Sequence, residues 1–245
     1  MRFSINEAFK FSFQIFKENW TKLLNISLFS IVLMIMLLYF MSKYLLIHFD
    51  ILSLVTIPKN IILFVFFKNI SLLMPAIFLF CVTSTILPVF YGSKVQFKNY
   101  FLDAEKVINF MCGMLLLVLV PSILTLVSYE LFSKFDDGSV IFTFFLSLYM
   151  VMSLGIFVYL CRYLLFYIDV LKGQSIIKSL KKSARLLKGN LYKFVALIVL
   201  LYFINVVGVL SVVGGIFVLP LNALVLAHVY MQLTKSNEDI TQKNA

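Results

Sequence analysis

Long apolar runs separated by short basic segments dominate the pattern of this chain. A membrane-spanning helix needs about 20 largely apolar residues. The longest run, 191–233, has 43 residues without Asp, Glu or Arg, about twice the length that one such helix needs. We expect it to form two spans joined near Gly208, Ser211, Gly214 and Gly215, where turn-permissive residues cluster. The pattern predicts an all-α, polytopic fold with six spans, at about 23–41, 70–91, 110–128, 140–161, 191–210 and 213–233.

One stretch does not fit this scheme. Residues 51–69 contain two apolar segments of seven residues each, interrupted at Pro58-Lys59-Asn60 and again at Lys68-Asn69. We interpret 51–69 as an interfacial or loosely packed segment outside the second span. The alternative is a second span that starts at Ile61 and has Lys68 at its outer end.

Segments with one apolar and one basic face precede three of the spans. Residues 4–22 and 175–193 are identical in seven of 19 aligned positions, which indicates an internal repeat. A helix with such opposed faces lies in the membrane interface. We therefore predict interfacial helices at about 4–20, 94–109 and 174–189, although 94–109 matches the other two only weakly. Each would precede a two-helix hairpin, so the chain would contain three repeated units.

Composition agrees with a membrane protein. Of the 245 residues, 62% are hydrophobic and 13% are charged, with a mean hydropathy of +1.02, whereas a soluble domain has about 25% charged residues. These values exclude a soluble enzyme, a disordered protein and a free nucleic-acid-binding domain. We expect a single membrane domain over 1–233 and a polar cytoplasmic tail over 234–245.

The distribution of basic residues predicts the orientation. In the six-span scheme, 17 of the 21 Lys and Arg residues lie on one side of the membrane. Cytoplasmic loops are the ones enriched in Lys and Arg. Both termini should therefore be cytoplasmic, which agrees with an even number of spans.

The strongest candidate binding surface is the basic face of the segment 174–189. Anionic lipid attracts each basic residue near a membrane surface by about 1 kcal/mol. Binding of lipid headgroups is one interpretation, and a simple topology anchor, which we favour, is the other. Nucleic acid is not expected as a partner, because no base-reading or aromatic arrangement is present. The candidate headgroup contacts are Lys178, Lys181, Lys182, Arg185 and Lys188.

Other polar residues near the spans have structural interpretations. Arg162 and Asp169 are seven residues apart, which places them on one face of a helix. We favour a structural pair at the end of the fourth span over a substrate site. Asn205, Asn222 and His228 lie inside the last hairpin, where Asn side chains usually form hydrogen bonds between helices. Core packing is the favoured role of all three.

Catalytic and metal-binding patterns are missing from the sequence. It contains no Ser/His/Asp set, paired carboxylates, HExxH motif or phosphate-binding glycine loop, and an enzyme site needs such a group. The cysteines Cys81, Cys112 and Cys161 lie on separate spans, which does not favour a disulfide framework or a metal cluster. We expect no enzymatic activity, no cofactor and no metal.

Two stretches resemble a known bacterial family. They are RYLLFYIDVLKGQSIIKSLKKSARLLKGN, from Arg162 to Asn190, and EAFKFSFQIFKENW, from Glu7 to Trp20. Together with the hydrophobic hairpin that follows Asn190, they resemble the YciC-like inner-membrane proteins and the membrane domain attached to some glycerophosphoryl diester phosphodiesterases. The resemblance implies six spans in the bacterial cytoplasmic membrane. It implies no chemistry, since the stand-alone members of the family have no assigned activity and the 245 residues given, with six spans, leave no room for the phosphodiesterase catalytic domain.

The functional prediction follows from these observations. We expect a membrane protein without enzymatic chemistry that acts at the cytoplasmic leaflet, in lipid binding, envelope organisation or scaffolding. Its expected partners are membrane phospholipids, including anionic ones. The alternative is a small permease or flippase-like transporter of a neutral or lipid-like substrate, because the predicted span cores contain no charged residue that would couple an ion. The sequence leaves protein partners and the oligomeric state open.

Overall fold

The described part of the chain is almost entirely helical. The computed structural model describes residues 3–48, 76–93, 104–132, 140–210 and 214–243, and it has no strand within these ranges. The all-α prediction is therefore confirmed for the described residues. The helices are α1 (Ile5–His48), a helix at 76–86 that continues into the 3-10 helix η1 (Leu87–Tyr91), α4 (Ala104–Phe132), α5 (Val140–Tyr163), α6 (Phe166–Leu171), α7 (Ile176–Leu186), α8 (Leu191–Leu210) and α9 (Gly214–Lys243).

Within the described residues, four helical stretches are long and apolar enough to cross a membrane. They are Ala104–Leu124, Met150–Leu171, Leu191–Gly208 and Ile216–Ser236, and they overlap the last four predicted spans. The first predicted span lies inside α1, and the second is described only from residue 76, where it forms the shorter apolar helix Ala76–Tyr91. The segment 51–69 lies outside the described residues.

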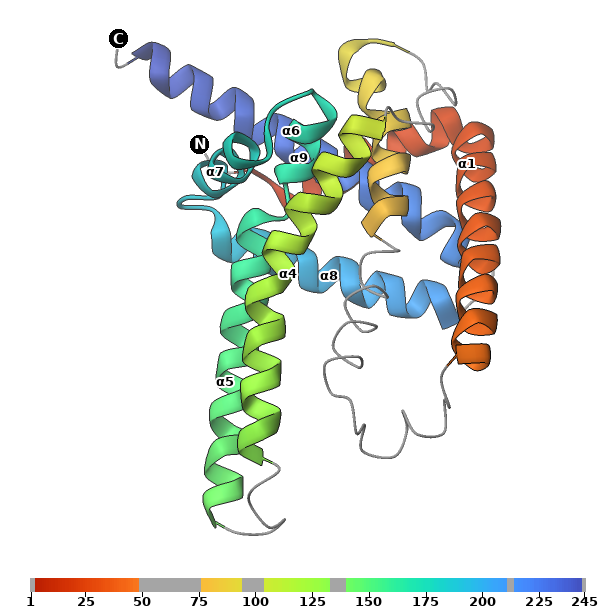
Figure 1. Cartoon of the computed structure of the whole chain (residues 1–245). Coiled ribbons are helices and arrows are strands. Elements are labelled where there is room, and N and C mark those ends of the chain that lie inside the picture. Colours follow the sequence, from red (N-terminus) through yellow and green to blue (C-terminus); the bar gives the residue numbers. More distant parts are fainter. Residues whose placement is uncertain (1–2, 49–75, 94–103, 133–139, 211–213, 244–245) are drawn as a thin grey trace.

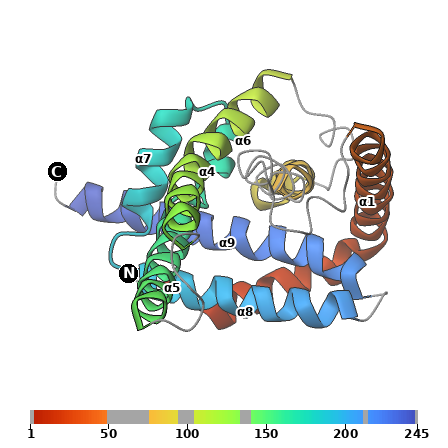
Figure 2. The same ribbon diagram turned by 60° about the horizontal axis from the view of Figure 1, so that its bottom comes forward.

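The long helices are not all parallel. Figure 1 shows α4 and α5 side by side, on the opposite side of the molecule from the second part of α1. In both views α8 extends from the α5 side toward α1, and Figure 2 shows α9 next to it. In Figure 1, α8 therefore runs across the direction of α4 and α5.

Helix α1 bends at Asn19, next to the end of the predicted interfacial helix 4–20. Asn19 has non-helical φ/ψ angles of −121° and 18°, and its side-chain amide donates a hydrogen bond to the carbonyl oxygen of Ile15. Before Asn19 the helix packs along α9, with Ala8 fully buried. After Asn19 it turns down the edge of the molecule (Figure 1). The predicted segment 4–20 is thus a distinct helical part.

The other two predicted interfacial helices differ from each other. The segment 174–189 forms the separate helix α7, and Gly189, with a φ of +83°, makes the turn into α8. In contrast, 104–109 is the beginning of α4, and 94–103 lies outside the described residues. The described part of the predicted interfacial helix 94–109 is therefore not a separate helix, because residues 104–109 continue directly into the apolar part of α4.

Two further features add to what the sequence predicted. The short helix α6 follows α5, and all six of its residues are buried. The described part of the predicted polar tail, 234–243, is helical, because α9 continues to Lys243. Close packing holds α6 in place: a side chain at Gly113 of α4 would collide with the Phe166 ring. A glycine at this position therefore allows α6 to approach α4.

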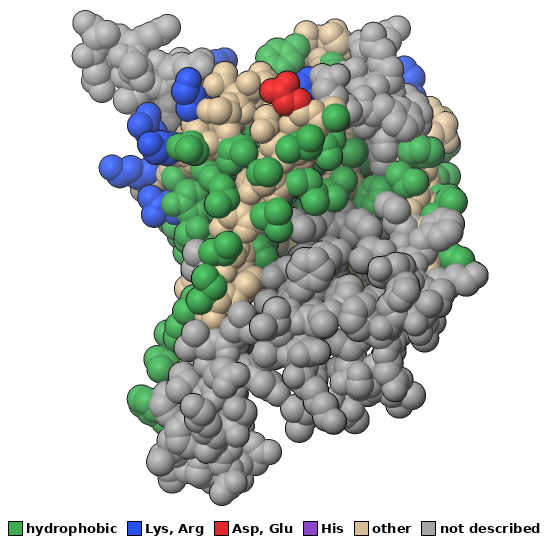
Figure 3. All heavy atoms as spheres, in the orientation of Figure 1, with side chains coloured by type: hydrophobic (Ala, Val, Ile, Leu, Met, Phe, Trp, Pro, Cys, Tyr) green, Lys and Arg blue, Asp and Glu red, His purple; other side chains and the backbone are tan. Residues whose placement is uncertain are grey.

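The outer faces of α4, α5 and α8 are apolar and exposed. Figure 3 shows hydrophobic side chains over the upper parts of α4 and α5. Exposed apolar patches of this extent mark surfaces that contact a membrane or another protein. The large apolar side chains that are more than half exposed on these helices include Leu115, Leu116, Leu119 and Ile123 on α4, Met150, Val151 and Leu154 on α5, and Tyr202, Phe203 and Val207 on α8.

Candidate functional site at helix α7

Helix α7 packs on the helical core through small side chains. Ser179 and Ser183 are fully buried, and Leu186 continues the same inward face. The Ser183 hydroxyl donates a 3.1 Å hydrogen bond to the backbone carbonyl of Arg162 at the end of α5. Small residues permit close approach of two helices. This approach places α7 against α4, α5, α6 and α9.

Four of the five predicted headgroup contacts are exposed around α7. Lys178, Lys181, Arg185 and Lys188 all point to the surface, and none of them forms an ion pair with an acidic residue in the described part of the chain. In Figure 3, Lys and Arg side chains gather on the left of the molecule, where Figure 1 shows α7. These four cations are available to an external anion.

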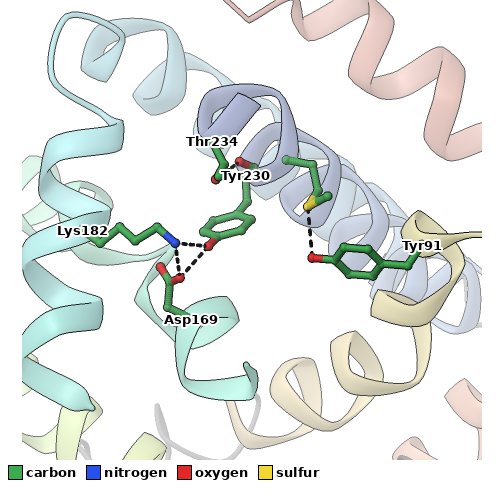
Figure 4. A network of polar contacts seen from close by, with 6 residues as sticks. Tyr91, Asp169, Lys182, Tyr230 and Thr234 are labelled. Atoms are coloured by element: carbon green, nitrogen blue, oxygen red, sulfur yellow. Dashed lines mark hydrogen bonds and ion pairs between the residues drawn. The ribbon is translucent and has the colours of Figure 1, made fainter. Parts of the chain in front are cut away.

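The fifth predicted contact, Lys182, belongs to a buried network instead. Its ammonium lies 2.7 Å from Oδ1 of Asp169, which is fully buried on α6. The Tyr230 hydroxyl of α9 donates a 2.5 Å hydrogen bond to the same carboxylate oxygen and accepts a 2.9 Å hydrogen bond from Lys182 (Figure 4). Three helices thus meet at one carboxylate.

The predicted pair of Arg162 and Asp169 is wrong, because Asp169 pairs with Lys182. The seven-residue spacing would align the two residues only on one continuous helix. The chain leaves the helical path at residues 164–165, between α5 and α6, and this break rotates Asp169 away from Arg162. Arg162 is exposed, and its guanidinium lies 5.9 Å from the Tyr163 ring centre.

The environment of Lys182 favours its charged form. Partial burial lowers the pKa of Lys182, but hydrogen bonds and charge interactions with Asp169 and Tyr230 outweigh the burial and raise that pKa above the ordinary value. A second cation, Lys172, lies 4.7 Å from the Tyr230 ring centre and 5.5 Å from that of Tyr91. Lys182 alone pairs with the buried carboxylate, and Lys172 adds a second positive charge beside Tyr230.

An open groove lies beside this network, between α4, α5 and α7. It has a volume of about 370 Å³. Tyr159 and Tyr163, with ring centres 5.1 Å apart, line it on the α5 side. Lys181 and Arg185 are its charged residues. Its remaining lining residues are apolar, namely Leu116, Leu117, Ile177, Leu180 and Ala184.

The three polar residues of the predicted last hairpin, Asn205, Asn222 and His228, all contact side chains of neighbouring helices. The Asn222 side-chain amide donates a 2.8 Å hydrogen bond to Oδ1 of Asn205, which joins α9 to α8. The His228 ring stacks on Phe11, with ring centres 4.3 Å apart. Among the residues that the structure describes, no three His, Cys, Asp or Glu side chains are grouped to hold a metal ion.

Two members of the site could not be identified from the sequence. Tyr230 stands in an apolar run and carries no charge, so only its position opposite Asp169 reveals its role. The short helix α6 has no capping side chain at its start. In the sequence, its mostly apolar residues therefore cannot be distinguished from a continuation of α5. Asp169 itself could be identified from the sequence as a residue that needs a partner, since it is a single acidic residue next to a predicted span.

Comparisons with protein-family models, with curated proteins and with solved structures found no match.

Proposed function

We propose that this chain is a multi-pass protein of the bacterial cytoplasmic membrane that binds anionic phospholipid at the cytoplasmic leaflet and has no enzymatic chemistry. The observation that carries the proposal is the set of exposed cations on α7 and just after its end, namely Lys178, Lys181, Arg185 and Lys188, none of which has an acidic partner in the described structure. The helix that bears them packs directly on membrane-length apolar helices.

The membrane topology belongs to this proposal. We infer six spans, with 23–41 and 70–91 as the first two, and cytoplasmic termini. The excess of Lys and Arg on one side of the scheme supports this orientation. The start of α1 and the end of α9 lie on the same side of the molecule as α7 (Figure 1), which also supports it. The crossing direction of α8 requires that α8 be strongly tilted relative to α4 and α5 if all three span the membrane.

Lipid binding is favoured over a topology anchor by the way in which the charges are distributed. A pure anchor needs only net positive charge in the loop. On α7, Lys182 is neutralised by Asp169, whereas the remaining cations face outward beside an apolar groove. Such a helix combines the basic and apolar contacts of an interfacial lipid site. The resemblance to YciC-like inner-membrane proteins is in keeping with this proposal.

The test is native mass spectrometry of the full chain released from membranes in mild detergent. We expect the wild type to retain anionic phospholipid at a fixed ratio, and a variant with Lys178→Gln, Lys181→Gln and Arg185→Gln to lose it. Lys182 is left unchanged, because its removal would disrupt the Asp169 network. The matched control removes three exposed lysines of α1 by Lys10→Gln, Lys17→Gln and Lys22→Gln. Retention by the α7 variant, or equal loss from both variants, would contradict a lipid site on α7.

A further inference from the structure

The groove between α4, α5 and α7 has the chemistry of a single-lipid site, which is more specific than a charged surface. Its two cations, Lys181 and Arg185, both belong to α7. Its apolar lining comes from all three helices and includes Leu116 and Leu117 on α4. A molecule that fits this groove must therefore have an anionic part and an apolar part.

The position of the groove separates these two parts. Tyr159 and Tyr163 lie in the last turns of α5, close to α7. Leu116 is more than half exposed and is followed along α4 by the exposed side chains of Leu119 and Ile123. The apolar lining thus continues directly into the outer apolar surface of α4, where lipid tails would lie in a membrane.

The size of the groove limits how much of the ligand it can hold. Its volume of about 370 Å³ is near the lower end of the range for small-molecule sites, about 300–1,000 Å³. It can enclose part of an acyl chain and the adjoining headgroup atoms. The rest of the lipid would stay in the bilayer.

We propose that this groove binds one anionic phospholipid, with its phosphate at Lys181 and Arg185 and one acyl chain along Leu116, Leu117 and Tyr159. Arg can bind phosphate through two parallel hydrogen bonds, and Lys supplies a compact charge. The inference rests on the proposed function and makes it specific: binding is stoichiometric and depends on the shape of the groove as well as on charge. Lys178 and Lys188, which do not line the groove, contribute little to it.

The experiment uses the full chain in mild detergent, with added phosphatidylglycerol or phosphatidylcholine of identical acyl chains, and native mass spectrometry. We expect one phosphatidylglycerol per chain and at least tenfold lower occupancy by phosphatidylcholine. Ala184→Trp, which fills the groove, should reduce the phosphatidylglycerol occupancy at least tenfold. The matched control is Ala196→Trp on the exposed face of α8, and it should retain the lipid.

A pair of charge variants separates the groove from the rest of α7. Lys181→Gln with Arg185→Gln should lose the lipid, whereas Lys178→Gln with Lys188→Gln should retain it. If both double variants lose the lipid equally, or if the Ala184→Trp variant retains it, the groove is not the binding site. Such a result would indicate diffuse binding of lipid to α7 instead. If all of these variants retain it, the proposed function fails as well. If phosphatidylcholine binds as well as phosphatidylglycerol, the proposed requirement for an anionic headgroup is wrong.

A second measurement does not depend on filling the groove. Ile177→Trp in a Trp20→Phe background places the one tryptophan of the chain at the groove wall. Phosphatidylglycerol with brominated acyl chains should quench its fluorescence in a saturable way, and brominated phosphatidylcholine should not. Absence of quenching in a folded variant would overturn the proposal.

Discussion

The ammonium of Lys182 lies 2.7 Å from the carboxylate of Asp169, across the junction between α7 and the buried helix α6. The two side chains differ sharply in exposure: Asp169 is completely buried, whereas 42% of the Lys182 side chain is accessible. A buried carboxylate is costly without a partner. Lys182 therefore has its role inside the protein, although its sequence context is that of a surface charge.

Loss of the ammonium should destabilise the fold. Lys182→Gln would leave Asp169 with Tyr230 as its remaining partner among the described residues. A buried polar group that loses its partner costs about 1–3 kcal/mol, and access of water to the Lys182 position should keep the loss in the lower part of that range. The measurement is reversible unfolding in detergent, with Lys178→Gln as the control. Equal stability of the two variants would contradict the structural role of Lys182.

Tyr230 should be energetically coupled to Lys182. Tyr230→Phe removes the hydroxyl that donates to Asp169 and accepts from Lys182. Hydrogen bonds to charged groups contribute about 1.5–3 kcal/mol. Because both residues contact one carboxylate, the double variant with Lys182→Gln should differ from the sum of the two single losses by at least about 0.5 kcal/mol. Strict additivity in this double-mutant cycle would show that the three side chains do not act as one network.

The contribution of Lys182 should persist to high pH. Its pKa is higher in the folded protein than the ordinary lysine value of 10.5. Its stabilising effect should therefore be complete below that ordinary value and be lost as the pH rises through the folded pKa. The stability difference between the wild type and Lys182→Gln should stay constant from about pH 7 to 9 and decrease only above about pH 10. A decrease between pH 7 and 9 would contradict the raised pKa.

The approach of α6 to α4 should make Gly113 sensitive to substitution. A methyl group at Gly113 would collide with Phe166 and contact Ile176, and such overpacking costs about 1–3 kcal/mol. Gly155 of α5 is also inside a helix but has no atom near the position of a Cβ. Gly155→Ala should therefore be neutral or stabilise by up to about 1 kcal/mol. Thermal unfolding of the two alanine variants tests this contrast, and equal effects would refute it.

Labelling of single cysteines should distinguish six spans from four. In a chain whose own cysteines are replaced, Lys43→Cys should react with a membrane-impermeant maleimide added outside intact cells, and Lys188→Cys should not. With only the last four spans inserted, Lys43 would be cytoplasmic and protected. Both cysteines must react after the membrane is opened, which controls for accessibility.

The sequence predicted those elements of the fold whose signal is local. The apolar run 191–210 coincides with α8, and the basic amphipathic segment coincides with α7, because both patterns depend only on residues near one another in the chain. The bend at Asn19 lies next to the end of the predicted segment 4–20, where the pattern changes from amphipathic to apolar. Two amides in one apolar hairpin favoured a hydrogen bond between helices but did not identify its partners, and the structure pairs Asn222 with Asn205.

The partner of Asp169 could not be predicted in this way. It depends on a two-residue break after α5 that rotates the carboxylate toward Lys182, and on a tyrosine 61 positions away. The groove beside α7 likewise combines residues of α4, α5 and α7, whose relative placement is a property of tertiary packing. Periodicity describes one helix at a time and contains no information on such neighbours.

The two basic amphipathic segments that resemble each other are held by the same short part of α9. Tyr230 reaches the α7 network, while His228 stacks on Phe11 of α1 and Gln232 donates a 3.5 Å hydrogen bond to Glu7. These three contacts all lie within five residues of one helix. They set a fixed spacing between the two positively charged segments. On a bilayer, the protein would therefore present two cationic contact points at a constant separation. Substitution of the basic residues would weaken the contacts with lipid headgroups but would not change the distance between them.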